Sequence, residues 1–245
     1  MTDATSLPPP TPLPPPAYFG GLDLGQMADY SALAVVERAA HLEDGRLAYR
    51  YAVRHLHRWP LRTAYPDIAD DVVRLYARRP LAGSTLLVDR TGVGAPVCDM
   101  ILRAEPEAWV IPVTITGGAQ AGWAGGCRTV PKRDLAGALQ ALLGQRRLDV
   151  SPSLPLAQVL AREMQTFTVK INIATGNESF EAWRDRDHDD LVLAVATACW
   201  YGERTIGWDD GAVIIDTPAP SGRDRLVPRP NSEAQRRLIP PGRRW

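Results

Sequence analysis

Four aspartates stand beside apolar runs, where charged side chains are uncommon. Asp23 ends the run "YFGGLD", and Asp89 ends the run "STLLVD". Asp189 and Asp190 directly precede "LVLAVATACW", a stretch without a polar face that predicts a buried helix. Aspartate is disfavoured inside strands, and charges carried into a protein are costly to bury unless they are paired or bind a metal. These four residues are therefore the first candidates for chemistry.

The chemistry that suits this set is that of divalent cations. Converging carboxylates without a basic partner nearby in the sequence repel one another and raise one another's pKa. Mg²⁺ or Mn²⁺ removes this repulsion, because hard oxygen ligands suit both ions. Two such ions about 4 Å apart can activate a water and stabilise the leaving oxygen of a phosphodiester. We therefore expect a two-metal site formed by Asp23, Asp89 and either Asp189 or Asp190.

Each aspartate also has a simpler interpretation. Asp23 fits a strand-to-turn position, and Asp89 could cap the turn "RTGVG". Asp189 or Asp190 could cap the apolar helix, since a carboxylate accepts hydrogen bonds from the free N–H groups of the first turn. One cap needs one aspartate, so the second stays unexplained.

Three more residues are auxiliary candidates. His188 could orient a metal ligand or a water, or simply flank the helix. Asp29 could join the ligands or occupy a turn. Lys132 could meet a phosphate or begin a solvated helix.

The apolar periodicity predicts the elements that would position these residues. Strands are expected at residues 18–24, 31–38, 47–59, 84–89 and 109–113. Helices are expected at residues 65–78, 95–104, 132–145 and 156–166 and from 191 onward. A β-hairpin is expected within residues 167–183, turning at Gly176 and Asn177. Three strands followed by alternating helices and strands predict an α/β fold with an RNase H-like mixed five-stranded sheet, flanked by helices, plus the added hairpin. In that sheet the first and fourth strands are neighbours, so Asp23 and Asp89 would lie side by side.

Composition sets the boundaries of this interpretation. Formal net charge is zero, so no global basic field indicates nucleic-acid binding. Cys98, Cys127 and Cys199 are far apart and form no metal-ligand spacing, which favours a reducing compartment. No signal peptide follows Met1, and we expect a cytoplasmic protein. The expected organisation is a disordered proline-rich tail at residues 1–17, one domain at 18–216, and a tail rich in proline and arginine at 217–245.

Three segments together resemble a known family. The segments "GLDLGQMADYSALAVVE", "LLVDRTGVGAPVCDMI" and "HDDLVLAVATACW" resemble the acidic motifs of the C-terminal nuclease domain of the large terminase subunit of tailed bacteriophages. The similarity extends over about residues 18–201. "VPKRDLAGALQALL", "LAREMQTFTV" and the residues before "HDD" are also similar to that family.

The resemblance implies an RNase H-like, metal-dependent endonuclease that cuts concatemeric viral DNA, in which genome copies are joined end to end, during genome packaging. It implies Asp23 and Asp89 as strand ligands and Mg²⁺ or Mn²⁺ as cofactor. The third ligand falls in the "HDD" motif, with Asp190 as first choice and Asp189 close behind. The implied partners are double-stranded DNA, a packaging ATPase, the small terminase and portal proteins in the host cytoplasm of a phage or prophage, and no membrane. One departure is that the sequence has no GxxxxGK[ST] phosphate loop. We therefore expect that this chain does not translocate DNA by itself.

Several other functions remain open. "LDLG" and "VDRTGVG" also resemble the paired phosphate loops of actin-like and sugar-kinase-like nucleotide-binding proteins, which normally need two domains. A dinucleotide site at "TGVGAPV" lacks the third glycine and the link to the first strand. A non-catalytic DNA-binding packaging module would bind DNA without metal. Junction resolvases and transposase cores use similar carboxylates, but the "HDD" ending favours the terminase type.

Overall fold

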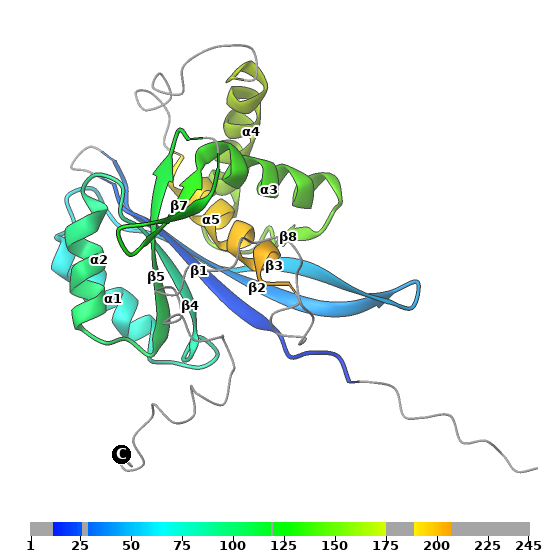
Figure 1. Ribbon diagram of the computed structural model, residues 1–245, viewed down its shortest axis with the longest axis horizontal. Coiled ribbons are helices and arrows are strands. Elements are labelled where there is room, and N and C mark those ends of the chain that lie inside the picture. The colour runs from blue at the N-terminus through cyan, green and yellow to red at the C-terminus, as the bar shows by residue number, and fades with distance from the viewer. Residues whose placement is uncertain (1–11, 26–28, 119, 175–188, 207–245) are drawn as a thin grey trace, which may run out of the picture.

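The strand β1 (Ala17–Asp23) lies in the interior of an eight-stranded mixed sheet in this computed structural model, which describes residues 12–25, 29–118, 120–174 and 189–206 (Figure 1). The other strands are β2 (Ala32–Glu43), β3 (Arg46–Arg58), β4 (Ser84–Asp89), β5 (Ala108–Thr116), β6 (Gly122–Ala124), β7 (Cys127–Pro131) and β8 (Leu148–Val150). Their order across the sheet is β6-β7-β5-β4-β1-β2-β3-β8. β1, β2 and β3 form an antiparallel meander, while β4 is parallel to β1 and β5 is parallel to β4.

Helices cover both faces of the sheet (Figure 1). They are α1 (Tyr65–Tyr76), α2 (Gly94–Arg103), α3 (Lys132–Gly144), α4 (Ala157–Ala174) and α5 (Asp190–Arg204). One buried apolar cluster joins the sheet to α1 and α2, and another joins it to α3, α4 and α5. The sheet is therefore the middle layer of three.

Two adjacent glycines let both helical layers approach β1 closely. A Cβ atom on Gly20 would lie 1.7 Å from the Tyr76 hydroxyl of α1. A Cβ atom on Gly21 would lie 2.0 Å from the backbone carbonyl oxygen of Ala194 in α5. Successive residues of a strand face opposite sides of the sheet. Gly20 therefore makes room for α1 on one face, and Gly21 makes room for α5 on the other.

The predicted buried helix is confirmed in α5. The side chains from Asp190 to Gly202 are all buried. This helix packs mainly on β1 and β2 and is covered by α3 and α4. Its position against the centre of the sheet fixes where its two ends lie.

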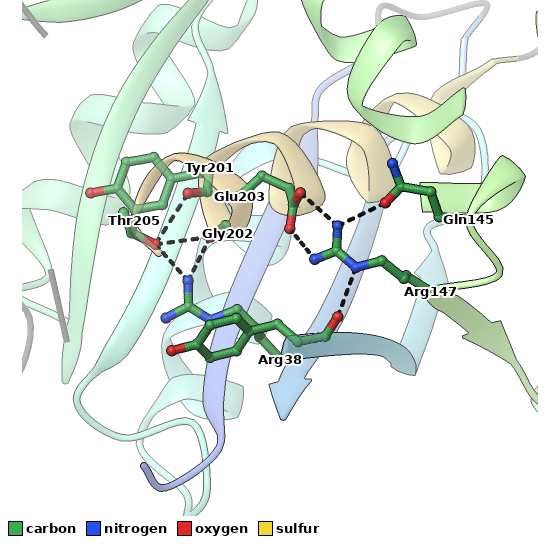
Figure 2. Close-up of polar contacts among 8 residues, drawn as sticks. Arg38, Gln145, Arg147, Tyr201, Gly202, Glu203 and Thr205 are labelled. Carbon is green, nitrogen blue, oxygen red and sulfur yellow. Dashed lines mark hydrogen bonds and ion pairs between the residues drawn. The ribbon is translucent and has the colours of Figure 1, made fainter. Parts of the chain in front are cut away.

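Two arginines hold the C-terminal end of α5 (Figure 2). Arg38 of β2 is buried and donates hydrogen bonds to the carbonyl oxygen of Gly202 (2.5 Å) and to Thr205 Oγ1 (3.1 Å). Arg147 donates to both carboxylate oxygens of Glu203, at 2.7 and 3.0 Å. Cations near a helix C-terminus interact favourably with the helix dipole. The end of α5 away from the aspartates is therefore tied to β2 and to the segment before β8.

The α/β class with a mixed sheet between helices is confirmed, but the sheet has eight strands rather than the five predicted. β6 and β7 lie in and after the glycine-rich segment at residues 117–126, where no strand was predicted, and β8 has only three residues.

The predicted hairpin is wrong where it can be compared, because α4 runs without a break through Ala174. Leu160, Met164 and Phe167 follow helical spacing and pack in the core, and this outweighs the strand preference of the β-branched residues that follow. The rest of that hairpin, residues 1–11 and the tail at 217–245 lie outside the described residues.

Candidate active site

Asp23 and Asp89 end adjacent parallel strands. Leu22 of β1 pairs with Val88 of β4, and Asp23 and Asp89 are the next residue of each strand, so their backbones are about one strand spacing, roughly 4.8 Å, apart. Both side chains point to the α5 face, because Gly21 and Leu87, two residues earlier in each strand, pack against α5 and its core. The two carboxyl groups therefore meet at one edge of the sheet.

The electrostatics of this pair show that the carboxyl groups are crowded. Burial raises the pKa of Asp23 well above its usual range, and repulsion from Asp89, Asp189 and Asp190 adds to the increase. Burial also raises the pKa of Asp89, while hydrogen bonds from Thr91 oppose the rise. Thr91 donates to Asp89 Oδ1 through its backbone N–H (2.8 Å) and its hydroxyl (2.5 Å). A hydrogen bond with Asp23 also opposes the rise in the pKa of Asp89.

The N-terminal end of α5 is capped by a residue from another helix. Asp189 occupies the N-cap position, yet its side chain makes no capping hydrogen bond. Glu163 of α4 caps the helix instead, since its Oε2 accepts a hydrogen bond from the backbone N–H of Val192 at 3.0 Å. Lys132 Nζ lies 3.1 Å from Asp189 Oδ2. The simple capping interpretation therefore does not account for the side chain of Asp189.

Asp190 belongs to a buried ionic cluster with Arg58 and Glu163. The Nε atom of Arg58 lies 2.7 Å from Asp190 Oδ2, and a second guanidinium nitrogen contacts Glu163. Burial raises the pKa of Glu163 to about 7, and repulsion from Asp190 contributes, whereas the cation of Arg58 opposes the rise. One arginine thus holds two carboxyl groups, and the cluster retains an excess of acid.

The auxiliary candidates have different positions. Lys132 begins α3 and is drawn into the site through Asp189. Asp29 is exposed and lines a hollow of about 320 Å³ with Gly25 and Ser31, beside the end of β1. His188 lies outside the described residues.

Two functional candidates, Arg58 and Glu163, were missed from the sequence. Glu163 does carry a signal, since it is a charged residue on the buried stripe of α4 formed by Leu160, Met164 and Phe167. Arg58 has no comparable signal, because it lies 105 residues from its partner Glu163.

The donor set fits a hard divalent cation by its chemistry. All of its candidate ligand atoms are carboxylate oxygens, which Mg²⁺ and Mn²⁺ prefer. Cation binding requires deprotonated ligands, so binding to carboxyl groups with raised pKa values would release protons. As they are placed, the His, Cys, Asp and Glu side chains in the described segments form no group of three or more that could hold a metal ion.

No protein-family model matches this chain, and no curated protein matches it. In the segments described, none of the helices has both the length and the apolar character needed to cross a membrane. The function is therefore inferred from the residues of the site.

Proposed function

We propose that this protein is a metal-dependent DNA endonuclease with an RNase H-like fold, of the type found in the phage large terminase. The observation that carries the proposal is that Asp89, Asp189 and Asp190 surround Asp23, whose pKa is raised by burial and by their repulsion. Such an excess of buried negative charge is unfavourable by itself, and it is typical of sites that bind cations.

The strand arrangement gives independent support. The inner order β5-β4-β1-β2-β3, with β1 to β3 antiparallel and β4 and β5 parallel to β1, agrees with the order expected for an RNase H-like sheet. The carboxylates come from β1, from β4 and from the start of α5, as the resemblance to the terminase nuclease implies.

Each residue has a defined part in this mechanism. Asp23 and Asp89 would hold Mg²⁺ or Mn²⁺, which when bound supplies the Lewis acidity that activates water and stabilises the leaving oxygen. Thr91 fixes the orientation of Asp89 through its two hydrogen bonds. Lys132 offers a cation beside the carboxylates that can contact a phosphate oxygen of the substrate.

Two observations favour Asp189 over Asp190 as the third ligand. Asp190 is only 4% exposed and is engaged by Arg58, which fixes the start of α5. Asp189 is more exposed, raises the pKa of Asp23 more strongly than Asp190 does, and has no capping role. This reverses the order of preference taken from the sequence. Asp190 is then a positioning residue.

The experiment that tests the function is cleavage of supercoiled plasmid in Mn²⁺, in Mg²⁺ and in EDTA. We expect metal-dependent cleavage that Asp23→Asn, Asp89→Asn and Asp189→Ala reduce by more than about a hundredfold, since even residues that only support metal ligands affect activity by about 10- to 100-fold. Asp190→Asn should reduce it less. Asp149→Asn, an exposed position on β8, is the matched control and should cut normally.

Two results would reject the proposal. One is metal-dependent cleavage that survives both Asp23→Asn and Asp89→Asn in folded protein. The other is no cleavage by the wild type together with no proton release when Mn²⁺ is added, because cation binding to carboxyl groups with raised pKa values releases protons.

The biological setting follows from the resemblance alone. We propose concatemeric viral DNA as the substrate. A packaging ATPase, a small terminase and portal proteins would be the partners, in the cytoplasm of the bacterial host. Co-purification of a tagged chain with these proteins from phage-producing cells tests this setting separately from cleavage.

A further inference from the structure

Two tryptophans and two arginines are linked by cation–π contacts between α5 and the strands β6 and β7. The guanidinium carbon of Arg128 in β7 lies 5.5 Å from the ring centre of Trp123 in β6 and 5.6 Å from that of Trp200 in α5. The guanidinium carbon of Arg204 lies 4.8 Å from the ring centre of the same Trp200. We call Trp123, Arg128, Trp200 and Arg204 the Trp–Arg stack. Cation–π contacts of this kind hold arginines in place without neutralising their charge.

Two buried donors of the Trp–Arg stack lack an acceptor among the described residues. They are Nε of Arg128 and Nε1 of Trp200. Buried polar groups are nearly always hydrogen-bonded, so each exception calls for an explanation. Burial and the neighbouring charge of Arg204 lower the pKa of Arg128. The surroundings of Arg128 therefore favour an additional anion.

A hollow of about 440 Å³ opens beside the stack. Trp200 and Arg204 line it from α5, and Arg133 and Asp134 line it from α3. Arg133 and Arg204 share Asp134 as an acidic neighbour, at 3.8 and 3.5 Å. Glu203, which also lines the hollow, is bound by Arg147. Two arginines and two carboxylates line the hollow, and Arg128 and Arg147 lie beside it. With these two arginines counted, positive charge is in excess around the hollow, in contrast to the carboxylate edge.

The register of the sheet connects the Trp–Arg stack to the carboxylates. Asp89 pairs with Val113 of β5, Val113 pairs with Arg128, and Arg128 pairs with Trp123. These residues form one row across the strands. Asp89 and Arg128 both point to the α5 face, and two strand spacings put their backbones about 10 Å apart. One DNA strand carries a phosphate about every 3.4 Å along the duplex axis, and its winding makes successive phosphates farther apart than this rise. The separation therefore corresponds to fewer than three nucleotides.

We propose that the Trp–Arg stack binds the DNA strand a few nucleotides or less from the carboxylate pair. Backbone phosphates would contact Arg128 and Arg204, and a base or sugar would pack on the exposed ring of Trp123. Arginine suits phosphate through its planar set of donors, and aromatic rings bind bases of any sequence by stacking. The inference deepens the proposed nuclease function and rests on it for the identity of the ligand.

The test measures DNA binding in EDTA, so that cleavage plays no part. Fluorescence anisotropy of a labelled 20-nucleotide single strand and of the matching duplex would compare the wild type with Trp123→Ala and Arg128→Gln. Trp123 is 41% exposed, so its truncation should leave the fold intact. We expect Trp123→Ala to weaken binding by at least about fivefold. Arg128→Gln should weaken it at least as much and lower the salt dependence by about one phosphate contact.

Two control variants lie on the opposite helical layer. Leu102→Ala removes an exposed apolar side chain from α2, and Arg74→Ala removes an exposed cation from α1. Both should bind DNA like the wild type. Equal binding by Trp123→Ala and the wild type would overturn the proposal, as would an equal loss in Arg74→Ala.

The same variants separate this proposal from that of the nuclease. If Trp123→Ala loses binding but the wild type neither cuts nor releases protons in Mn²⁺, the strand-binding site stands and the nuclease function fails. If the wild type cuts in Mn²⁺ and all variants bind and cut alike, the nuclease stands and the Trp–Arg stack has no role in binding.

Discussion

The two ends of α5 differ in how well their charged side chains are matched by partners. At the C-terminal end, Arg38 binds the carbonyl oxygen of Gly202 and Arg147 binds both oxygens of Glu203 (Figure 2). At the N-terminal end, five carboxyl groups gather beside two cations. The acids are Asp23, Asp89, Glu163, Asp189 and Asp190, and the cations are Arg58 and Lys132.

The contrast distinguishes charged groups that stabilise the fold from charged groups that are suited to bind a ligand. Where a buried charge has a matched partner, removing that partner destabilises the protein, because the other charge is left uncompensated. Where like charges are crowded, removing one relieves repulsion and stabilises the protein while it removes function. The same kind of substitution should therefore have opposite effects at the two ends.

The largest effect on stability is expected at the C-terminal end, from Arg38→Ala. The side chain is 2% exposed, and its loss removes the donor to Gly202 and a cation lying 5.2 Å from the ring centre of Phe19. We expect the free energy of unfolding to fall by about 2–4 kcal/mol, because the buried oxygens of Gly202 and Thr205 lose a charged donor. Urea denaturation measures it. A loss below about 1 kcal/mol would remove the distinction between the two ends.

Asp23→Asn should act in the opposite direction at the N-terminal end. The raised pKa of Asp23 means that the folded protein binds a proton there more tightly than the unfolded chain does. Its stabilising contribution is therefore complete at acidic pH, below the ordinary aspartate range, and is lost as pH rises through the folded-state pKa. In EDTA at pH 8 we expect the variant to be more stable than the wild type by on the order of 1–2 kcal/mol. Urea unfolding measures this difference.

Cation binding should reverse that ranking. Mg²⁺ or Mn²⁺ stabilises the protein that binds it by mass action, so the wild type should gain stability and Asp23→Asn should not. Thermal unfolding with and without Mn²⁺ measures both. Asp149→Asn is the control, and an equal response of all three proteins would argue against Asp23 as a ligand.

Much of the fold could be predicted because the central strands and α5 carry strong apolar patterns. β6 and β8 could not, since three residues give no periodicity. Asp23 and Asp89 could be placed side by side because the strand order follows from the alternation of elements. The roles at the start of α5 could not, because Glu163 caps that helix from a segment 29 residues away and no local pattern records such a pairing.

Glu163→Gln should alter the pH dependence more than the fold. Glutamine can still accept the hydrogen bond from Val192, so the cap is retained. Because the folded-state pKa of Glu163 is about 7, above the ordinary value of 4.5, its contribution to stability is complete below about pH 4.5 and is lost as pH rises through 7. We expect the variant to gain on the order of 1–3 kcal/mol relative to the wild type between pH 5 and pH 8 in EDTA. Parallel pH profiles of the two urea midpoints would show that Glu163 does not titrate in this window.

Lys132→Met should give the smallest change in stability and a clear change in substrate binding. The contact of Lys132 with Asp189 is partly exposed, and such ion pairs contribute about 0–1 kcal/mol. Removing the cation also leaves Asp189 facing Asp23 without its neighbour, which should strengthen Mn²⁺ binding while weakening DNA binding in EDTA. Calorimetric titration with Mn²⁺ and anisotropy with DNA measure the two effects.

Arg133→Met, the adjacent exposed cation on α3, is the matched control for Mn²⁺ affinity, which it should leave unchanged. If Lys132→Met weakens Mn²⁺ binding instead, Lys132 positions the carboxylates and does not bind the substrate. The charges at the N-terminal end of α5 would then stabilise the fold, as those at the C-terminal end do.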